Sequence, residues 1–106
     1  MAGRIESYIH SDSITAHKGG VLVKVASQTD FAARTDEFIG FSQKVAKMAY
    51  AFGAGESESP EGLTWDELIH LAGRANMGAA LEQERVELAA KLKETITVEK
   101  IVVLIL

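Results

Sequence analysis

The chain has 106 residues, enough for one hydrophobic core, so we expect a single domain over residues 1–106. It contains no cysteine, which excludes disulfides, thiolate metal sites and cysteine nucleophiles. The formal net charge is −4 and no basic stripe is present, which argues against direct nucleic-acid binding. The longest apolar run, residues 101–106, is far shorter than the roughly 20 residues of a membrane span. We therefore expect a cytoplasmic protein that acts on another protein, without membrane contact.

Two segments near the start show the alternation of β-strands. Residues 4–10 alternate Ile5 and Ile9 with charged and aromatic neighbours, which predicts a strand with one buried face. Residues 20–25 place three valines on one side of a second strand. The segment between them is polar and glycine-containing, so the two strands are expected to pair as a hairpin with a long connection.

A first helix is predicted after Thr35, which can cap it, with Asp36 and Glu37 in the favourable first turn. Its apolar side chains recur at steps of three and four residues and form one stripe, which we assign to the core. The members of this stripe are Phe38, Phe41, Val45, Met48 and Phe52. Glycines then end the helix, and an acidic, serine-rich loop is expected over 56–62.

Two further helices follow. Thr64 and Glu67 have the spacing of a capping box, so a short helix should begin here and end near Gly73. Asn76 can cap the next helix, whose apolar positions recur at helical spacing. These positions are Met77, Leu81, Leu88 and Leu92.

From Ile96 the pattern alternates again and then becomes apolar on both faces of a strand over 101–106. One face can pack on the helices, while the other needs a second cover; the alternative is that the run is buried within one copy. We expect a homodimer with contacts through Ile101, Val103 and Ile105. The order strand-strand-helix-helix-helix-strand predicts an α+β domain with a small, three-stranded antiparallel sheet covered on one face by three helices.

The most informative stretch lies between the second strand and the first helix, where Asp30 and Phe31 stand side by side at a polar corner. No base, nucleophile or metal ligand lies near them in sequence, so the pair suits a wedge between protein surfaces better than catalysis. Three blocks of the chain, in this order, resemble elongation factor Ts, the guanine-nucleotide exchange factor of elongation factor Tu. They are Tyr8-Ile9-His10 with Gly20-Val21-Leu22-Val23, then residues 28–34 (QTDFAAR), then residues 82–92 (EQERVELAAKL).

The resemblance implies that the chain binds elongation factor Tu and promotes GDP release by disturbing the site that holds the magnesium ion of the nucleotide. It assigns the contacts to residues 29–32 of this sequence: Phe31 is the wedge and Asp30 orients it, with Thr29 and Ala32 beside them. Arg34 is a rim contact and His10 a weaker candidate. The chain itself would bind no nucleotide, metal or other cofactor and would not be an enzyme.

The chain departs from the family pattern in three respects. We expect one core subdomain without the family's usual N-terminal helical domain, which favours a second hypothesis, a module that binds elongation factor Tu or itself without exchange activity. Lys93 stands where the family commonly has glycine, so we expect a differently shaped path into the last strand. Glu99 and Lys100 stand where arginines are common, which puts charge contacts there in doubt.

Each site residue also has an ordinary structural interpretation. An isolated Phe31 is more often a core aromatic, and Asp30 could cap the turn that follows it. His10 at a strand end is more often simply solvated. The retained Asp30-Phe31 pair favours the exchange factor over the binding-only module.

Overall fold

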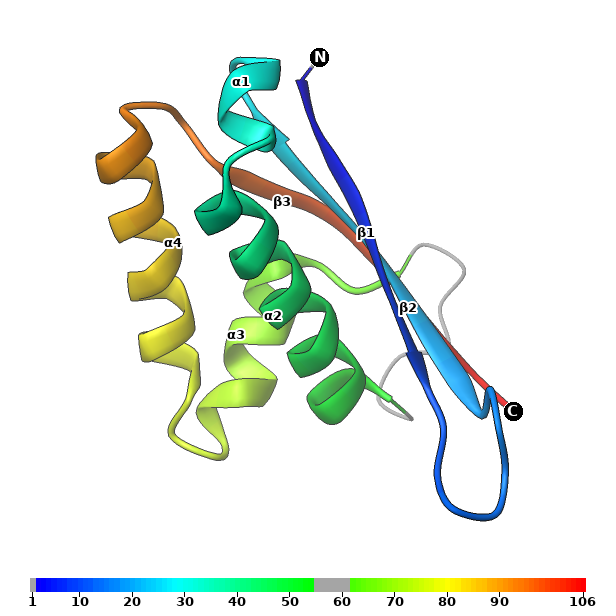
Figure 1. The fold of residues 1–106 in the computed structure, drawn as a ribbon. Coiled ribbons are helices and arrows are strands. Elements are labelled where there is room, and N and C mark those ends of the chain that lie inside the picture. The colour runs from blue at the N-terminus through cyan, green and yellow to red at the C-terminus, as the bar shows by residue number, and fades with distance from the viewer. Residues whose placement is uncertain (1, 55–61) are drawn as a thin grey trace.

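The structure is a computed structural model that describes residues 2–54 and 62–106. The described residues form three strands and four helices, arranged as in Figure 1, and the α+β expectation is confirmed. Along the chain the elements are β1 (Ala2–His10), β2 (Gly19–Ser27), α1 (Asp30–Ala33), α2 (Asp36–Gly53), α3 (Trp65–Gly73), α4 (Gly78–Leu92) and β3 (Thr97–Ile105). The additional helix, α1, is a single turn at the corner that carries Asp30 and Phe31.

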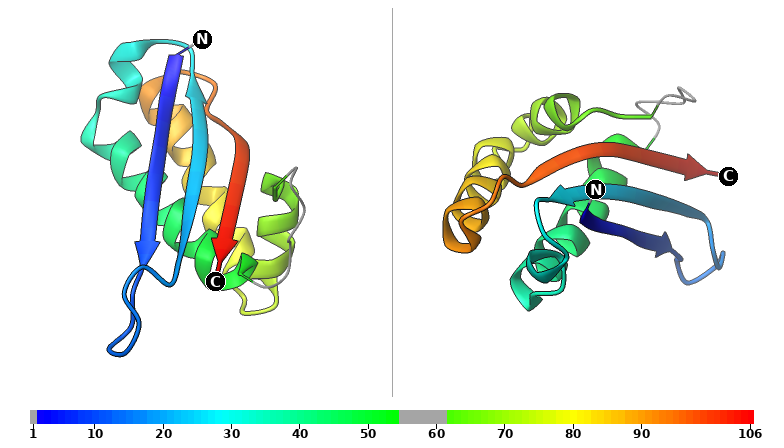
Figure 2. Two further views of the ribbon diagram at one scale, coloured as in Figure 1. Left: turned by 90° about the vertical axis from the view of Figure 1, so that its right-hand side faces the viewer. Right: turned by 90° about the horizontal axis from the view of Figure 1, so that it is seen from above.

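The three strands form one antiparallel sheet in the order β1-β2-β3. The predicted hairpin of β1 and β2 is confirmed, with Tyr8 opposite Val21 and His10 opposite Gly19. Figure 2 shows the helices on one face of the sheet, while the other face is left open. The sheet therefore has a covered face, which builds the core, and an open face.

The core lies between the covered face and the helices. The predicted valines at positions 21, 23 and 25 are all buried, because alternate residues of β2 point to the same side. Facing them, α2 buries four of the five predicted stripe residues, and Phe52 packs at the edge of the core. Those four are Phe38, Phe41, Val45 and Met48.

Of the three helix caps predicted from the sequence, two are present. Thr35 accepts a hydrogen bond from the amide of Phe38, and the Thr64–Glu67 capping box is present with both bonds formed. The prediction for Asn76 is wrong: Met77 occupies the cap position of α4 and no side chain caps this helix. Asn76 instead takes a positive φ of 60° in the tight turn between α3 and α4. The loop expected over 56–62 lies almost wholly outside the described residues.

The expected buried face of β1 is wrong. Ile5 and Ile9 lie on the open face and are 60% and 56% exposed, whereas the alternate residues, including Tyr8 and His10, face the helices and are half-buried. A strand at the edge of a sheet covered on one side can carry its apolar residues outward if another surface covers them. The predicted alternation of β1 is confirmed, but the face that the helices cover is the one opposite to Ile5 and Ile9.

The last strand changes its phase at a β-bulge opposite Lys24 and Val25. Two consecutive residues, Glu99 and Lys100, are both exposed, and the residues on either side of them, Val98 and Ile101, both face the core. A bulge of this kind adds one residue to a strand and shifts the register beyond it. Strict alternation of residues along the sequence therefore does not predict which residues of β3 are buried beyond the bulge.

The phase of β3 corrects the expected dimer contacts. Ile101 pairs with Val23 and Val103 with Val21 on the covered face, and Ile101 is fully buried. Its side chain is therefore not available to a second copy. The open face of β3 instead presents Val102 and Leu104, which lie opposite Leu22 and Gly20. Ile105, at the end of the strand, is 42% exposed but belongs to the covered side.

Candidate functional site at the Asp30–Phe31 corner

The corner begins where β2 ends. Ser27 donates its hydroxyl hydrogen to the carbonyl of Thr29 at 2.8 Å, which turns the chain away from the sheet. The Thr29 hydroxyl then accepts a hydrogen bond from the amide of Ala32 at 3.2 Å and caps α1. Thr35 closes the turn, because its hydroxyl donates to the carbonyl of Ala32 and also caps α2. Two threonines thus define the one-turn helix at both ends.

This turn points Phe31 into solvent. Phe31 is 79% exposed, although the next two residues, Ala32 and Ala33, are buried against the rest of the molecule. The interpretation of Phe31 as a core aromatic is therefore wrong. Ala32 is 1% exposed, so it anchors the turn. Its side chain is not available to a partner, contrary to what the resemblance implies.

Asp30 and Arg34 complete the exposed surface of the corner. Thr29, and not Asp30, is the capping residue of α1, so the capping interpretation of Asp30 is also wrong. The Asp30 carboxylate makes no hydrogen bond or ion pair within the part of the chain that the structure describes. Arg34 follows the turn, and its amide donates to the carbonyl of Phe31 at 3.2 Å while its side chain is exposed. The corner therefore presents an aromatic ring, a negative charge and a positive charge.

A carboxylate from a distant part of the sequence binds the back of the corner. Glu94, between α4 and β3, accepts hydrogen bonds from the amides of Gln28 and Thr29 at 2.9 and 3.0 Å, and from the Thr29 hydroxyl. In return, the side-chain oxygen of Gln28 accepts the amide of Thr95 at 2.8 Å. The hydrogen bond from Thr29 lowers the pKa of Glu94, and the two backbone amides act in the same direction.

The path that brings Glu94 to the corner depends on Lys93. This residue has φ 56° and ψ 41°, the left-handed conformation that commonly ends a helix. The amides of Lys93 and Glu94 then donate to the carbonyls of Ala90 and Ala89, which satisfies the end of α4. Glycine adopts this conformation most easily, so Lys93 occupies a glycine-type turn. The expected difference of this path from that of the family stays a prediction.

Sequence reasoning did not find Glu94 as part of the site. Glu94 directly follows Lys93, which stands where the family commonly has glycine, and nothing else in the sequence around it marks a site residue. The hydrogen bonds link positions 65 and 66 residues apart, and no local pattern predicts such contacts.

His10 does not lie at the corner. It pairs with Gly19 at one end of the β1–β2 hairpin, whereas Ser27, at the other end of β2, leads into the corner. For a strand of nine residues the separation is roughly 26 Å. His10 is also not simply solvated: its ring stacks on Tyr50 with centroids 4.6 Å apart, and its Nδ1 lies 2.8 Å from the Tyr8 hydroxyl.

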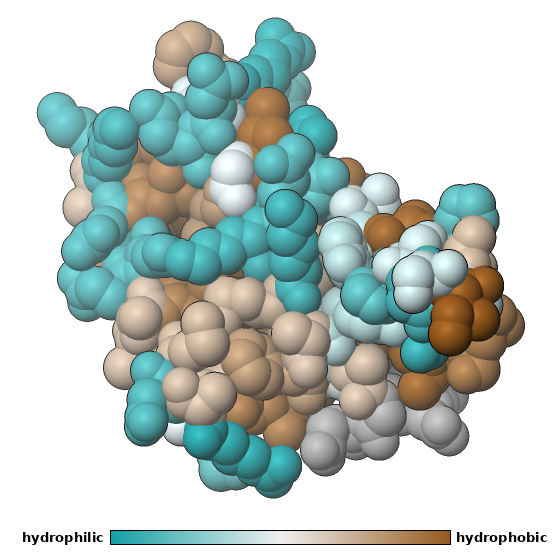
Figure 3. All heavy atoms as spheres, turned by 60° about the horizontal axis from the view of Figure 1, so that its bottom comes forward, coloured by the Kyte–Doolittle hydropathy of each residue, from teal (hydrophilic) through white to brown (hydrophobic). Residues whose placement is uncertain are grey.

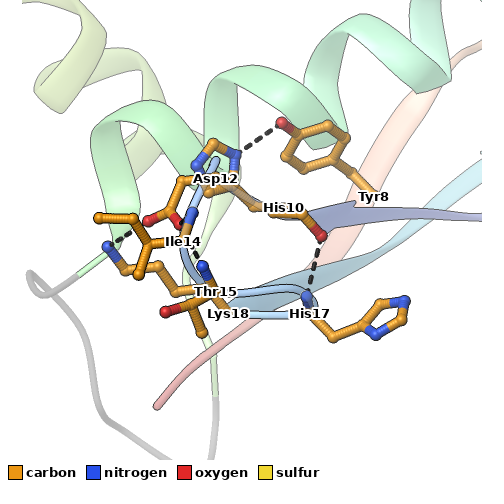
Figure 4. Close-up of polar contacts among 8 residues, drawn as sticks. Tyr8, His10, Asp12, Ile14, Thr15, His17 and Lys18 are labelled. Atoms are coloured by element: carbon orange, nitrogen blue, oxygen red, sulfur yellow. Dashed lines mark hydrogen bonds and ion pairs between the residues drawn. The ribbon is translucent and has the colours of Figure 1, made fainter.

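The hairpin loop beside His10 is held by Asp12, as Figure 4 shows. The Asp12 carboxylate accepts the amides of Ile14 and Thr15 at 2.9 and 2.6 Å and forms an ion pair with Lys18 at 3.3 Å. The two backbone hydrogen bonds, with a further contribution from Lys18, lower the pKa of Asp12 to about 2. The loop presents Ile14, which is 92% exposed, at the end of the molecule opposite to Phe31.

The open face of the sheet carries a second exposed surface. Ile9, Leu22 and Leu104 are 56, 53 and 70% exposed and line a groove of ≈ 510 Å³ with Val102 and Leu106. Seen from below in Figure 3, strongly apolar atoms gather on the side where Figure 1 places the hairpin and the end of β3. This open-face patch is defined here as Ile5, Ile9, Leu22, Val102 and Leu104.

The described residues offer neither a metal-binding cluster nor a membrane-spanning helix. Over residues 2–54 and 62–106, no group of three or more histidine, aspartate and glutamate side chains has an arrangement that could hold a metal ion. Within the same residues, none of the helices has the length and apolar character needed to cross a bilayer.

Comparison with known proteins gives one consistent set of relatives. The chain is 36% identical over 98 residues to elongation factor Ts of Methylococcus capsulatus, which covers 92% of this chain and 29% of the relative. It is 34% identical over 102 residues to elongation factor Ts of Arthrospira platensis, covering 96% and 36%. The protein of the same name from Nitrosospira multiformis is 33% identical over 84 residues, covering 78% and 24%. No protein-family profile matches the chain.

Proposed function

We propose that the chain binds elongation factor Tu and promotes release of GDP. It is similar to the translation factor elongation factor Ts over nearly all of its own length, and it spans about a third of the length of these relatives. The contact is made by the Asp30–Phe31 corner, with Thr29 and Arg34 at its rim. The observation that carries this proposal is the 79% exposure of Phe31 on a turn whose neighbouring residues are buried.

An exposed phenylalanine on a defined turn is suited to inserting into another protein. Solvent exposure of a large aromatic side chain is unfavourable in the free chain, and its burial in a partner's pocket recovers that free energy. The turn is already formed, so little conformational entropy is lost on binding. The Asp30 carboxylate, which has no partner among the described residues, is free to accept a hydrogen bond or to bind a cation of the other protein.

Nucleotide release follows from thermodynamic coupling. If the chain binds the nucleotide-free state of its partner more tightly than the GDP-bound state, it must weaken GDP binding by the same factor. Magnesium requires near-octahedral ligands at about 2.0–2.1 Å, so a small displacement of those ligands costs much of the affinity. On this proposal Phe31 supplies the displacement, and no nucleotide or metal binds to the chain itself.

The test is release of a fluorescent GDP analogue from elongation factor Tu, with a pull-down in parallel. The unaltered chain should accelerate release, and Phe31→Ala should remove the acceleration. Ile14→Ala is the matched control, because it also shortens an exposed apolar side chain but at the other end of the molecule. If the unaltered chain binds without accelerating release, the result favours the binding-only module. If the chain does not bind and does not accelerate release, the proposal is contradicted.

We further propose that the chain self-associates through the open-face patch. The patch supports this because several large apolar side chains lie exposed on one sheet face, and contiguous exposed apolar side chains mark interaction surfaces. The contacting residues on β3 are Val102 and Leu104. A second copy would cover the face that the helices leave open.

A further inference from the structure

We infer that Glu94 is a positioning residue for the corner: it holds Gln28 and Thr29 in place and so fixes the direction in which Phe31 points. This inference deepens the proposed function and rests on it for its effect on nucleotide release. The juxtaposition behind it is a carboxylate from the α4–β3 connection bound to the first residues after β2. Glu94 itself is not placed in contact with a partner.

The geometry concentrates three donors on one side chain. Glu94 accepts the amide of Gln28 through Oε1 at 2.9 Å, the amide of Thr29 through the same oxygen at 3.0 Å, and the Thr29 hydroxyl through Oε2. Hydrogen bonds to a charged acceptor are stronger than those between neutral groups. The amides of Gln28 and Thr29 make no other hydrogen bond within the described structure, so loss of Glu94 leaves both to water.

The link from Glu94 to Phe31 passes through Thr29. The Thr29 hydroxyl donates to Glu94 and accepts the amide of Ala32, so one oxygen joins the carboxylate to the cap of α1. Phe31 lies inside this single turn, and a four-residue helix has too few internal bonds to persist alone. The direction of the Phe31 side chain therefore depends on Thr29, and the position of Thr29 depends on Glu94.

Glu94 is itself well anchored. Its amide donates to the carbonyl of Ala89 at 3.1 Å, which fixes the first residues after α4. On the other side, Arg85 of α4 donates to the carbonyl of Ile96 at 2.9 Å and ties the same connection to its helix. Both contacts hold the connection against α4, so Glu94 transmits the position of a packed helix to the exposed corner.

The test compares Glu94→Ala and Glu94→Gln with the unaltered chain. Glu87→Gln is the control, because Glu87 is an exposed glutamate on α4 whose side chain, among the described residues, accepts a hydrogen bond only from Gln83 of the same helix. In Glu94→Ala we expect hydrogen exchange at the amides of Gln28 and Thr29 to become at least about tenfold faster, the factor expected from losing a charged acceptor. Glu94→Gln keeps one acceptor oxygen and should lie between the two, and Glu87→Gln should not change either amide.

Nucleotide release separates positioning from simple loss of structure. Two quantities are compared: the rate of GDP release at a saturating concentration of the chain, and the concentration of the chain that gives half of that rate. The Glu94 variants should lower the first by a larger factor than they raise the second. Misorientation of a group by about 1 Å can reduce a rate by roughly a hundredfold while most contacts remain. Melting curves of the variants check that the domain is folded.

Three results would overturn the inference. Unchanged exchange at both amides in Glu94→Ala would show that Glu94 does not hold the corner. Faster exchange with unchanged GDP release at saturation would show that holding the corner does not position Phe31.

If the unaltered chain does not accelerate GDP release, the proposed function fails by itself. The NMR order of Asp30–Ala33 in the free chain then decides: unchanged order in Glu94→Ala overturns the inference, and reduced order supports it.

Discussion

Glu94 binds Thr29 across 65 residues of sequence and joins the end of the last helix to the corner that presents Phe31. The contact is possible because β2 and β3 are neighbours in the sheet, so the segment leaving β2 and the segment entering β3 lie at the same end. The exposed aromatic at the corner is thus supported by the fold around it. This arrangement is the physical basis of both the proposed wedge and its positioning.

The first prediction concerns the stability of Phe31→Ala. Since Phe31 is 79% exposed, its truncation should change the free energy of unfolding by less than about 0.5 kcal/mol. Phe38→Ala, in the core, should cost roughly 3–5 kcal/mol. Chemical denaturation of the two variants measures both values, and a large loss for Phe31→Ala would mean that the ring packs within the molecule.

The second prediction uses the left-handed residue after α4. Lys93→Gly should stabilise the domain by about 1 kcal/mol, because glycine adopts φ 56° without the steric cost that a side chain brings. Glu87→Gly, an exposed interior position of the same helix, should instead destabilise by about 1 kcal/mol. Opposite signs for the two glycines in thermal melts would support the assignment, and a loss of stability in both would contradict it.

The third prediction is the acid behaviour of the hairpin loop. The pKa of Asp12 is lowered from 3.8 to about 2, so its stabilising contribution is complete above its ordinary pKa and is lost as the pH falls towards 2. The charge that faces the Asp12 carboxylate is that of Lys18. NMR titration of the Asp12 carboxyl carbon should give a midpoint near 2, with the amide signals of Ile14 and Thr15 moving together. A midpoint close to 4 would show that the loop bonds do not persist in solution.

The fourth prediction separates the two faces of β3. Leu104→Asp should leave a folded chain that no longer self-associates, because Leu104 is 70% exposed on the open face. Ile101→Asp should prevent folding, since a carboxylate would be placed without a partner at a fully buried position. Sedimentation velocity and circular dichroism distinguish these outcomes. An unaltered chain that is monomeric at micromolar concentration would contradict the proposed self-association.

Local chemistry in the sequence was sufficient for several elements. The capping box at Thr64 and Glu67, the cap at Thr35 and the valine alternation of β2 each depend on residues close in sequence, and the structure confirms all three. The α+β class followed from the order of these elements. The corner at Asp30 and Phe31 could also be located from the sequence, because its signature is a continuous block.

The tertiary structure alone decided which side of each edge strand is covered. Ile5 and Ile9 have the pattern of a buried face, yet they lie outward because the helices pack on the other side of β1. The bulge near Glu99 likewise moves Ile101 to the covered face. Residue alternation defines two faces of a strand but not which of them the rest of the chain will cover.

The sequence by itself determined the caps at Thr35 and Thr64, the periodicities and the position of the Asp30–Phe31 motif, because these depend on interactions within a few residues. Only the tertiary structure decided that Phe31 is exposed, that His10 lies at the far end of the hairpin and that Glu94 supports Thr29. Those facts depend on how β2, α4 and β3 pack together. Contacts of this kind join residues far apart in the chain, and local physical chemistry contains no information about them.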